Sequence, residues 1–504
     1  MKKVLFILVM LVCISCSPKT DVTNTVVAKN GNNSVVDEIY GLDEVSYTQY
    51  AEYVDKAKGS SPDNSNIADS NIAPSNIGDS NTSSNAYNSK TDDMILIYYG
   101  NKKRLKWGKS ELEKVVMHTF QDGHKDWFFP TFLYLEFKND MSLRFGDNQP
   151  GDEPANKESW EWLLNRYFST AYNDGNYEGL KALDECIESC KKRLGEPRFK
   201  HKVVLTVPSP CTNYTEWGSI KVNGRTIKLD FRNTSHKLEA VKWYINELVT
   251  RFKAQHYKNI TLEGLYWGEE NTTMTSWHKE KKSGKWTNKI GDKFDYVFDT
   301  NAKRHNDIVI SIGNYIHSIK GLKFYWIPYW NAYGSENKRW KNILGFDRCD
   351  IQTGYFWGTP DLLRGSKPFR TISDLRRICD AVINDGKGLE FEVSADLFVP
   401  CYGKLKNKRD VERPYDIVKV DGCKKTQKEM KAMGYTRFNY NPCLLVRFRN
   451  MMDVFEEQGV FNHVNISYYF DNSAILDLCN SRDKEIIELV DRLARHISRR
   501  NKNK

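Results

Sequence analysis

Long hydrophobic runs are almost missing from this chain of 504 residues. The one such run opens the sequence, in MKKVLFILVMLVCISCSPK, where Lys2 and Lys3 precede about ten apolar residues and Ser15 stands just before Cys16. A membrane-spanning helix needs about 20 consecutive apolar residues. We therefore expect no integral membrane protein, and the start of the chain is typical of an export signal.

Motifs for binding metals and nucleotides are missing as well. Beyond residue 16 the chain has nine cysteines, scattered and odd in number, with no CxxC and no Cys/His spacing of a zinc site. No predicted strand is followed by GxGxxG or a P-loop. We therefore predict no metal and no cofactor, and we expect Cys186 and Cys190 to be neighbours in the core rather than a disulfide.

The residues around the predicted cleavage site indicate a lipid anchor. The run Cys13-Ile14-Ser15-Cys16 is similar to a bacterial lipobox, with Cys13 where leucine is usual, and Cys16 would then carry the lipid. Plain secretion is the alternative. We predict a lipoprotein signal peptide over residues 1–15 and a protein held outside the cytoplasm at the outer membrane, on its periplasmic face or at the cell surface.

Residues 16–93 have the composition of a flexible tether. They carry few large apolar side chains and include SNIADSNIAPSNIGDSNTSSN, a five-residue repeat rich in Ser, Asn, Asp and Gly. Such a segment cannot bury enough apolar surface to fold, so we predict that it is disordered and holds the folded part off the membrane.

The formal net charge of +10 comes partly from the basic stretches HKEKKSGKWTNK, YGKLKNKRD and HISRRNKNK. Solvated loops and a helix end are the simplest interpretation, and attraction to an anionic glycan or membrane surface is the alternative. Because the chain is predicted to be exported, we expect no nucleic-acid partner, and we expect a monomer.

From residue 94 to about residue 500, short apolar runs alternate with helical periodicity. Gly195, Asn259, Gly321, Gly386 and Gly459 stand where helices would end before the next run. Eight strand–helix pairs predict a parallel sheet closed into a (β/α)8 TIM-type barrel over 94–500, with an open doubly wound sheet as the alternative. The predicted strands lie within residues 93–100, 128–137, 202–210, 260–270, 322–330, 349–357, 388–396 and 463–472.

Alternation within the runs supports closure. In the second run Leu133, Leu135 and Phe137 alternate with Tyr134 and Glu136, and the seventh and eighth runs alternate in the same way. We expect the apolar face of each strand to lie against the helices and the polar face to point toward the barrel mouth, where active sites of this fold sit.

Carboxylates stand at the ends of the fourth and seventh runs. Glu269 and Glu270 end the fourth, and Glu392 lies on the polar face of the seventh with Glu390 two residues before it. Cleavage of a glycosidic bond needs two carboxyls, one as acid and one as nucleophile or base. Solvated acids after a strand are the alternative, and Asp396 is a minor alternative nucleophile.

This layout resembles the large clan of (β/α)8 retaining glycosidases, in which the acid/base follows strand four and the nucleophile ends strand seven. The resemblance implies that Glu392 is the nucleophile. If Leu265 and Trp267 face the helices, Glu270 points inward, so we favour Glu270 as acid/base, with Glu269 second. The asparagine that usually precedes the strand-four acid in the clan is replaced here by Gly268.

Aromatic and polar residues gather at the same predicted strand ends. Sugar rings present apolar C–H faces that stack on aromatic side chains, and amides or carboxylates bind hydroxyls. Some of these aromatic residues are expected to pack the barrel instead. The predicted substrate-binding residues are Trp217, Trp267, Tyr329, Trp330, Asn331, Gln352, Tyr355, Trp357, Tyr468 and Asp471.

A further resemblance is carried by VLTVPSPC, the W-Y-I-x-E-L helix at 243–248, GLYWGEE, GLKFYWIPYWNAYG, LGFD with Gln352, and GLEFE. These motifs are similar to those of the bacterial family catalogued as domain of unknown function 4855, over about residues 94–498. The resemblance implies a barrel-like fold and a carbohydrate role, with no assigned catalytic residues.

Together these patterns predict a glycoside hydrolase, retaining by the clan resemblance, that acts on an extracellular or periplasmic polysaccharide or glycan. A non-catalytic carbohydrate-binding lipoprotein is the chief alternative. A lyase or a transglycosylase in the same cleft is the third.

Overall fold

The computed structural model describes residues 91–146, 153–169, 178–270, 302–330, 338–356 and 370–503, with short pieces between 272 and 294 and at 332 and 335. The predicted signal peptide, the lipid site at Cys16 and nearly all of the predicted tether lie outside the described residues. The tether does not extend to residue 93, because Thr91 and Asp92 are buried and Asp93 begins the first strand.

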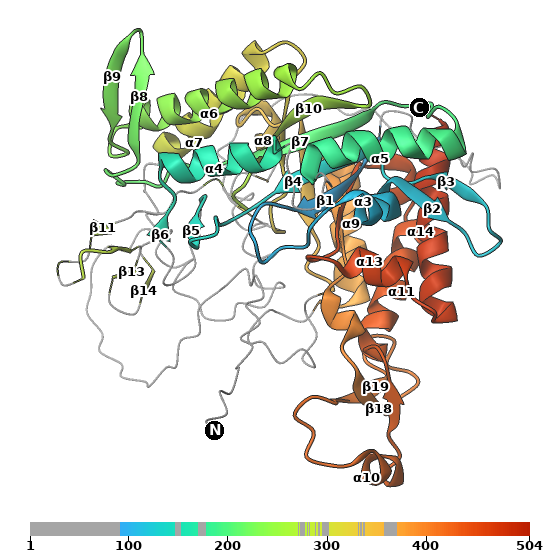
Figure 1. Ribbon diagram of the computed structural model, residues 1–504. Coiled ribbons are helices and arrows are strands. Elements are labelled where there is room, and N and C mark those ends of the chain that lie inside the picture. The colour runs from blue at the N-terminus through green and yellow to red at the C-terminus, as the bar shows by residue number, and fades with distance from the viewer. Residues whose placement is uncertain are drawn as a thin grey trace, which may run out of the picture. The chain divides into compact units, whose positions relative to one another are not determined.

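Among the described residues, eight parallel strands close into a barrel in which sequence neighbours are also neighbours in space (Figure 1). The predicted eight-stranded barrel is confirmed, and the open doubly wound sheet is wrong. Each strand lies within or next to a predicted run. The strands are β1 (Asp93–Tyr98), β4 (Thr131–Leu135), β7 (His201–Val207), β10 (Ile260–Trp267), β15 (Lys323–Trp326), β16 (Arg348–Gln352), β17 (Gly388–Glu392) and β21 (Ile466–Tyr469).

Helices connect the strands and cover the barrel. Figure 1 shows α4, α5 and α6 along one part of the barrel and α9, α11 and α14 along another. Among the described residues, no helix is long and apolar enough to cross a membrane. The helices are α3 (Lys109–Val116) after β1, α4 (Lys157–Tyr167) and α5 (Gly179–Leu194) after β4, α6 (Thr234–Ala254) after β7, α7 (Ala302–Ser318) after β10, α8 (Arg339–Asn342) after β15, α9 (Ile372–Asp385) after β16, α10 (Gln427–Ala432), α11 (Pro442–Glu457) and α12 (Val460–His463) after β17, and α13 (Ala474–Cys479) and α14 (Lys484–Lys502) after β21.

Local sequence sets where these helices begin and end. Before α9, Thr371 accepts from the backbone of Asp374 while the Asp374 carboxylate accepts from the backbone of Thr371, which is a capping box. Gly386 ends α9 at φ +66°, a conformation that glycine adopts without a Cβ penalty. Asn441 caps α11, whose first residue is Pro442.

Small sheets of two or three strands lie in the loops that connect the barrel strands and helices. The largest is an arm after β17 that consists of β18 (Cys401–Leu405), β19 (Tyr415–Lys419) and β20 (Thr436–Phe438), together with α10. Figure 1 shows this arm extending away from the barrel. The other short strands are β2 (Met117–Thr119), β3 (Lys125–Trp127), β5 (Leu143–Arg144), β6 (Glu153–Pro154), β8 (Gly218–Val222), β9 (Arg225–Leu229), β11 (His278–Lys279), β12 (Trp286–Thr287), β13 (Lys289–Ile290) and β14 (Lys293–Phe294).

The core has two parts, one between the strands and the helices and one inside the lumen of the barrel. Phe391 and Tyr468 pack with the helices, as alternation predicts. The prediction for the second strand is wrong, because Leu133 and Leu135 fill the lumen while Tyr134 faces the helix layer. An eight-stranded lumen is just wide enough for side chains to fill it, so part of it must be apolar.

The other part of the lumen is polar and is contributed by β16 and β21. Arg348 binds the carboxylate of Asp350 at 2.7 Å, and both side chains are almost fully buried. Ser467 donates a hydrogen bond to the same carboxylate. Gly388 leaves room for it, because a Cβ there would collide with Asp350. The nine cysteines beyond residue 16 are free, and Cys186 and Cys190 are both buried.

Removing one partner of this lumen ion pair should be costly. We expect Asp350→Ala to lower the free energy of unfolding by about 3–5 kcal/mol, because Arg348 would stay buried without its counter-charge. Urea unfolding followed by circular dichroism measures the change.

The matched control is Glu457→Ala, which removes a surface ion pair with Arg376. That change should cost less than about 1 kcal/mol. Equal losses in the free energy of unfolding for the two variants would show that the lumen ion pair stabilises the fold no more than a surface pair does.

Candidate active site

The carboxylates predicted from the sequence follow or end strands whose C-terminal ends lie at the same mouth of the barrel. β10 is separated from β17 by β15 and β16 in the closed order, so side chains from the two strands approach the lumen from different directions. Leu265 and Trp267 face the helix layer and Tyr266 faces the lumen, which confirms the alternation expected for β10.

Glu392, at the end of β17, is buried and held by the loop that follows β16. The hydroxyl of Thr353 and the backbone N–H of Gly354 each donate to Oε2 of Glu392 at 2.6 Å. Gly354 has φ +61°, in the left-handed region that favours glycine, and this turn aims its N–H at the carboxylate. Short hydrogen bonds of this kind orient an anionic oxygen and stabilise its charge.

Glu270 is held by β16 as well. The side-chain amide of Gln352 donates to Oε1 of Glu270 at 3.1 Å and to the carbonyl of Ile327 at 3.2 Å. Gln352 is also the register partner of Glu390 on β17. One predicted hydroxyl-binding residue therefore lies between the carboxylate that follows β10 and a carboxylate of β17.

Glu269 lies differently from its neighbour. Its side chain is buried against Gly146, where a Cβ would collide with its Oε1, and its backbone carbonyl accepts from the indole of Trp326 at 2.7 Å. Glu270 is the more exposed of the two. This difference agrees with the sequence preference for Glu270 as the acid that can reach a substrate.

Tyr266 joins the carboxylates and was not singled out from the sequence. Burial raises the pKa of its hydroxyl well above the ordinary value, and the negative charges of Glu270, Glu390 and Glu269 raise it further. Its hydroxyl therefore stays protonated across the physiological range, within the electrostatic influence of three carboxylates. The inward direction of Tyr266 could have been predicted from the sequence, because alternation along β10 places it on the same face as Gly264 and Gly268.

For four aromatic residues, the prediction that the side chain stacks on a sugar ring is wrong. Their side chains are buried in the layer between strands and helices, where a sugar ring cannot reach them. The ring of Trp217 packs on Trp160 at 5.1 Å, the Arg447 guanidinium lies over Tyr355 at 4.1 Å, and the Tyr468 hydroxyl donates to Asp93. These residues are Trp217, Trp267, Tyr355 and Tyr468.

Other predicted binding residues lie nearer the mouth. Tyr329 is 44% exposed and forms a β-bridge with Gln352, so an accessible aromatic ring adjoins the amide that holds Glu270. Trp330 is half-buried. Asn331 and Trp357 lie outside the described residues.

Asp471 follows β21 and is half-buried. Burial raises the pKa of its carboxyl above the ordinary value, and the charge of Asp396 acts in the same direction. Tyr469, next to Tyr468 in the eighth predicted run, was expected on the inward-facing side of that strand. It faces the lumen and packs edge-on against Tyr98 at 5.8 Å.

Within the described ranges no cluster of three or more His, Cys, Asp or Glu side chains could hold a metal ion.

Residues 93–297 match the family described as Domain of unknown function (DUF4855). The resemblance predicted from the sequence is thereby confirmed for the part from β1 to β14, which includes Glu269 and Glu270. The predicted span of 94–498 reaches further than the match. No curated protein matches the chain.

Several solved structures are similar at low identity. A fungal beta-1,4-galactanase matches with a TM-score of 0.34 and 10% identity, over 76% of this chain and 89% of that one. A Group IV chitinase of Ostrinia furnacalis has a TM-score of 0.36 and 9% identity, over 80% and 100%. A xylanase-alpha-amylase inhibitor protein has a TM-score of 0.32 and 11% identity, over 80% and 98%. The barrel fold is established by the order of the strands and not by these TM-scores.

The contact between Gly146 and Glu269 can be tested by stability. We expect Gly146→Ala to lower the free energy of unfolding by about 1–3 kcal/mol, because the new methyl group would strike a buried carboxyl. Chemical denaturation measures the loss.

The same substitution in a Glu269→Ala background should cost much less, since the group that the methyl strikes is gone. An unchanged loss in that background would show that Gly146 is needed for another reason and that Glu269 does not lie against it.

Proposed function

We propose that this barrel is a glycoside hydrolase that cleaves a polysaccharide or glycan with two carboxyl groups. The observation that carries the proposal is that Glu270 and Glu392, from different strands, are each held at the mouth by a separate donor set from β16 and its following loop. Two carboxyls that approach the mouth from different directions, one at the end of β17 and one just after β10, are what acid/base cleavage of a glycosidic bond requires.

Each carboxyl suits a different role. Glu392 receives two short hydrogen bonds on one oxygen, which suits an anion that acts as nucleophile. Glu270 is more exposed, which suits a group that exchanges a proton with the leaving oxygen, and the neutral amide of Gln352 donates to it. We propose a retaining reaction, which needs carboxyls about 5 Å apart across the bond.

Tyr266 and Tyr329 complete the proposal. The protonated hydroxyl of Tyr266, beneath the acids, can donate a hydrogen bond to a carboxylate as charge develops above it. The exposed ring of Tyr329 beside Gln352 offers an apolar face to a sugar ring.

The decisive experiment is reducing-sugar release from a panel of plant, microbial and host polysaccharides. We expect Glu392→Gln and Glu270→Gln to lower kcat/KM by about 100- to 10,000-fold, because each removes a proton-transfer or nucleophilic group. The matched control is Glu263→Gln, in the first half of β10, where the half-buried carboxylate binds Lys323. That variant should keep its activity. If the wild type binds a glycan but releases no reducing sugar from it, the protein is a carbohydrate-binding protein and not a hydrolase.

Aryl glycosides separate the candidate acids. A good leaving group needs little protonation, so Glu270→Gln should lose much less activity on an activated aryl glycoside than on the polymer. Glu269→Gln should show no such split if it only packs against Gly146. The reverse pattern would move the acid/base role to Glu269.

We also propose that lipid on Cys16 anchors the protein at the outer membrane, with residues 16 to about 90 as the tether. We expect Cys16→Ser to move the protein from the membrane pellet to the soluble fraction after ultracentrifugation, because the acyl chains that hold it would be missing. Cys423→Ser changes a free cysteine of the folded part, and this control should stay in the pellet. A Cys16→Ser protein that still sediments with membranes would contradict the anchor.

A further inference from the structure

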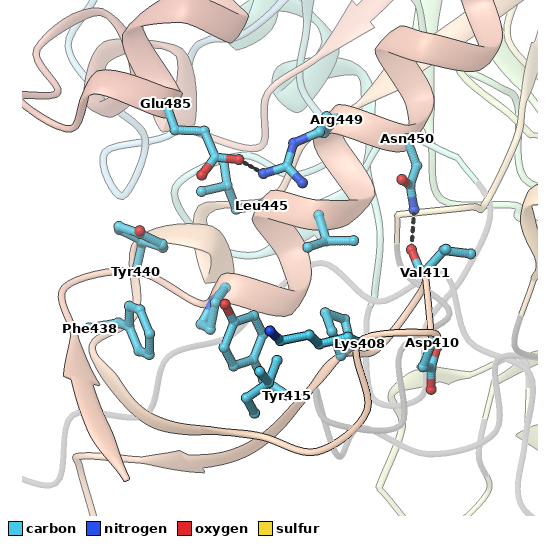
Figure 2. Close-up of a pocket in the computed structure, with 14 residues that line it drawn as sticks. Lys408, Asp410, Val411, Tyr415, Phe438, Tyr440, Leu445, Arg449, Asn450 and Glu485 are labelled. Atoms are coloured by element: carbon cyan, nitrogen blue, oxygen red, sulfur yellow. Dashed lines mark hydrogen bonds and ion pairs between the residues drawn. The ribbon is translucent and has the colours of Figure 1, made fainter.

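A cavity of about 440 Å³ lies outside the lumen, where the arm after β17 meets the first turns of α11 (Figure 2). Its volume falls in the range of small-ligand sites. Neither the carboxylates at the mouth nor Tyr266 and Tyr329 line it. The cavity is therefore distinct from the proposed active site.

One side of the cavity is a row of aromatic rings. Tyr415, Phe438 and Tyr440 line it, with ring centroids 5.8 Å apart for the first pair and 5.7 Å for the second. Each ring is half-buried, so it is fixed by packing and still accessible. Next to them Leu405 and Val411 are 46% and 57% exposed, which is unusual for large apolar side chains. The ring planes are tilted by 70° and 51° to each other, and together the rings offer a ligand an accessible apolar surface.

The remaining side chains of the cavity are polar and balanced in charge. Arg449 forms an ion pair with Glu485. Lys408 and Asp410 line the cavity from the loop between β18 and β19. In Figure 2 Arg449, Glu485 and Asn450 lie on the side opposite Tyr415 and Phe438. Two cations and two anions give a lining with no formal net charge, so the cavity has no preference for a charged ligand.

We propose that this cavity is a second binding site for a neutral oligosaccharide segment of a polysaccharide. Apolar C–H faces of sugar rings fit the aromatic row, and the hydroxyls fit donors and acceptors of both kinds on the facing side. The inference rests on the proposed function in one respect, since the ligand is the polymer class that the barrel would cleave.

The position of the cavity suits such a role. α11 returns from the C-terminal end of β17, so its first turns lie at the level of the barrel mouth. Next to Val411, Glu412 turns away from the cavity and accepts from the backbone of Ile372 at 2.6 Å and from Arg447 at 3.0 Å. Arg447 in turn donates to the carbonyl of Tyr355, in the loop that holds Glu392. The second site is thus fixed rigidly to the mouth and would keep the polymer beside it.

The test is affinity electrophoresis of the full chain in gels that contain galactan, xylan or a mixed-linkage β-glucan, with polygalacturonate as the acidic comparison. All proteins carry Glu392→Gln so that the gel polymer is not cut. We expect Tyr415→Ala to raise the Kd for the retarding neutral polymer about tenfold, because it removes a central aromatic contact. Tyr435→Ala changes a tyrosine of the same arm outside the cavity and should leave retardation unchanged.

A second variant guards against unfolding of the arm, because Tyr415 also packs on Phe438. Lys408→Ala changes an exposed side chain of the cavity and should raise the Kd about threefold with an unchanged melting temperature. In the protein that retains Glu392, Tyr415→Ala should raise KM for the polymer and leave turnover of an aryl glycoside unchanged.

The outcomes separate the two proposals. Retardation that Tyr415→Ala and Lys408→Ala weaken, together with no sugar release by the protein that retains Glu392, would support the second site and reject the hydrolase. Sugar release with equal retardation of all variants would overturn the second site and keep the hydrolase. Retardation by polygalacturonate alone, or by no polymer, would overturn the second site.

Discussion

Burial of charge inside a closed lumen is the constraint on which this structure depends. An eight-stranded barrel leaves no room for bulk water between its strands, so a polar side chain that points inward needs a partner inside the lumen. The carboxylate of Asp350 meets Arg348 of the same strand and Ser467 of β21 in this way. Apolar and aromatic side chains of β1, β4, β7, β10 and β15 fill another part of the lumen.

β16 supplies a partner at successive levels of the lumen. Asp350 balances Arg348, Gln352 holds Glu270, and Thr353 with Gly354 holds Glu392. None of these residues is itself a candidate acid. β16 and the loop that follows it therefore donate hydrogen bonds to both carboxylates, one at the end of β17 and one just after β10.

The strand–helix repeat, the closure of the barrel and the presence of acidic residues at the strand ends could be predicted from the sequence, because period-two alternation and strand ends are local signals. The orientation of the second strand could not. Leu133 and Tyr134 are both apolar enough for either face, and only the volume of the closed lumen decides between them. The burial of Trp217 and Tyr355 was equally hidden, because their partners Trp160 and Arg447 are distant in sequence.

The pairing of Glu412 with Arg447 has a consequence for how the arm relates to the barrel. Arg447 is fully buried in α11, and among the described residues the carboxylate that balances it comes from the arm. An arm excised at residues 401–438 would leave a guanidinium in the core without its counter-charge. The arm is therefore not a detachable module grafted onto a finished barrel. A version of this chain without the arm would need a change at position 447 or another partner for its guanidinium.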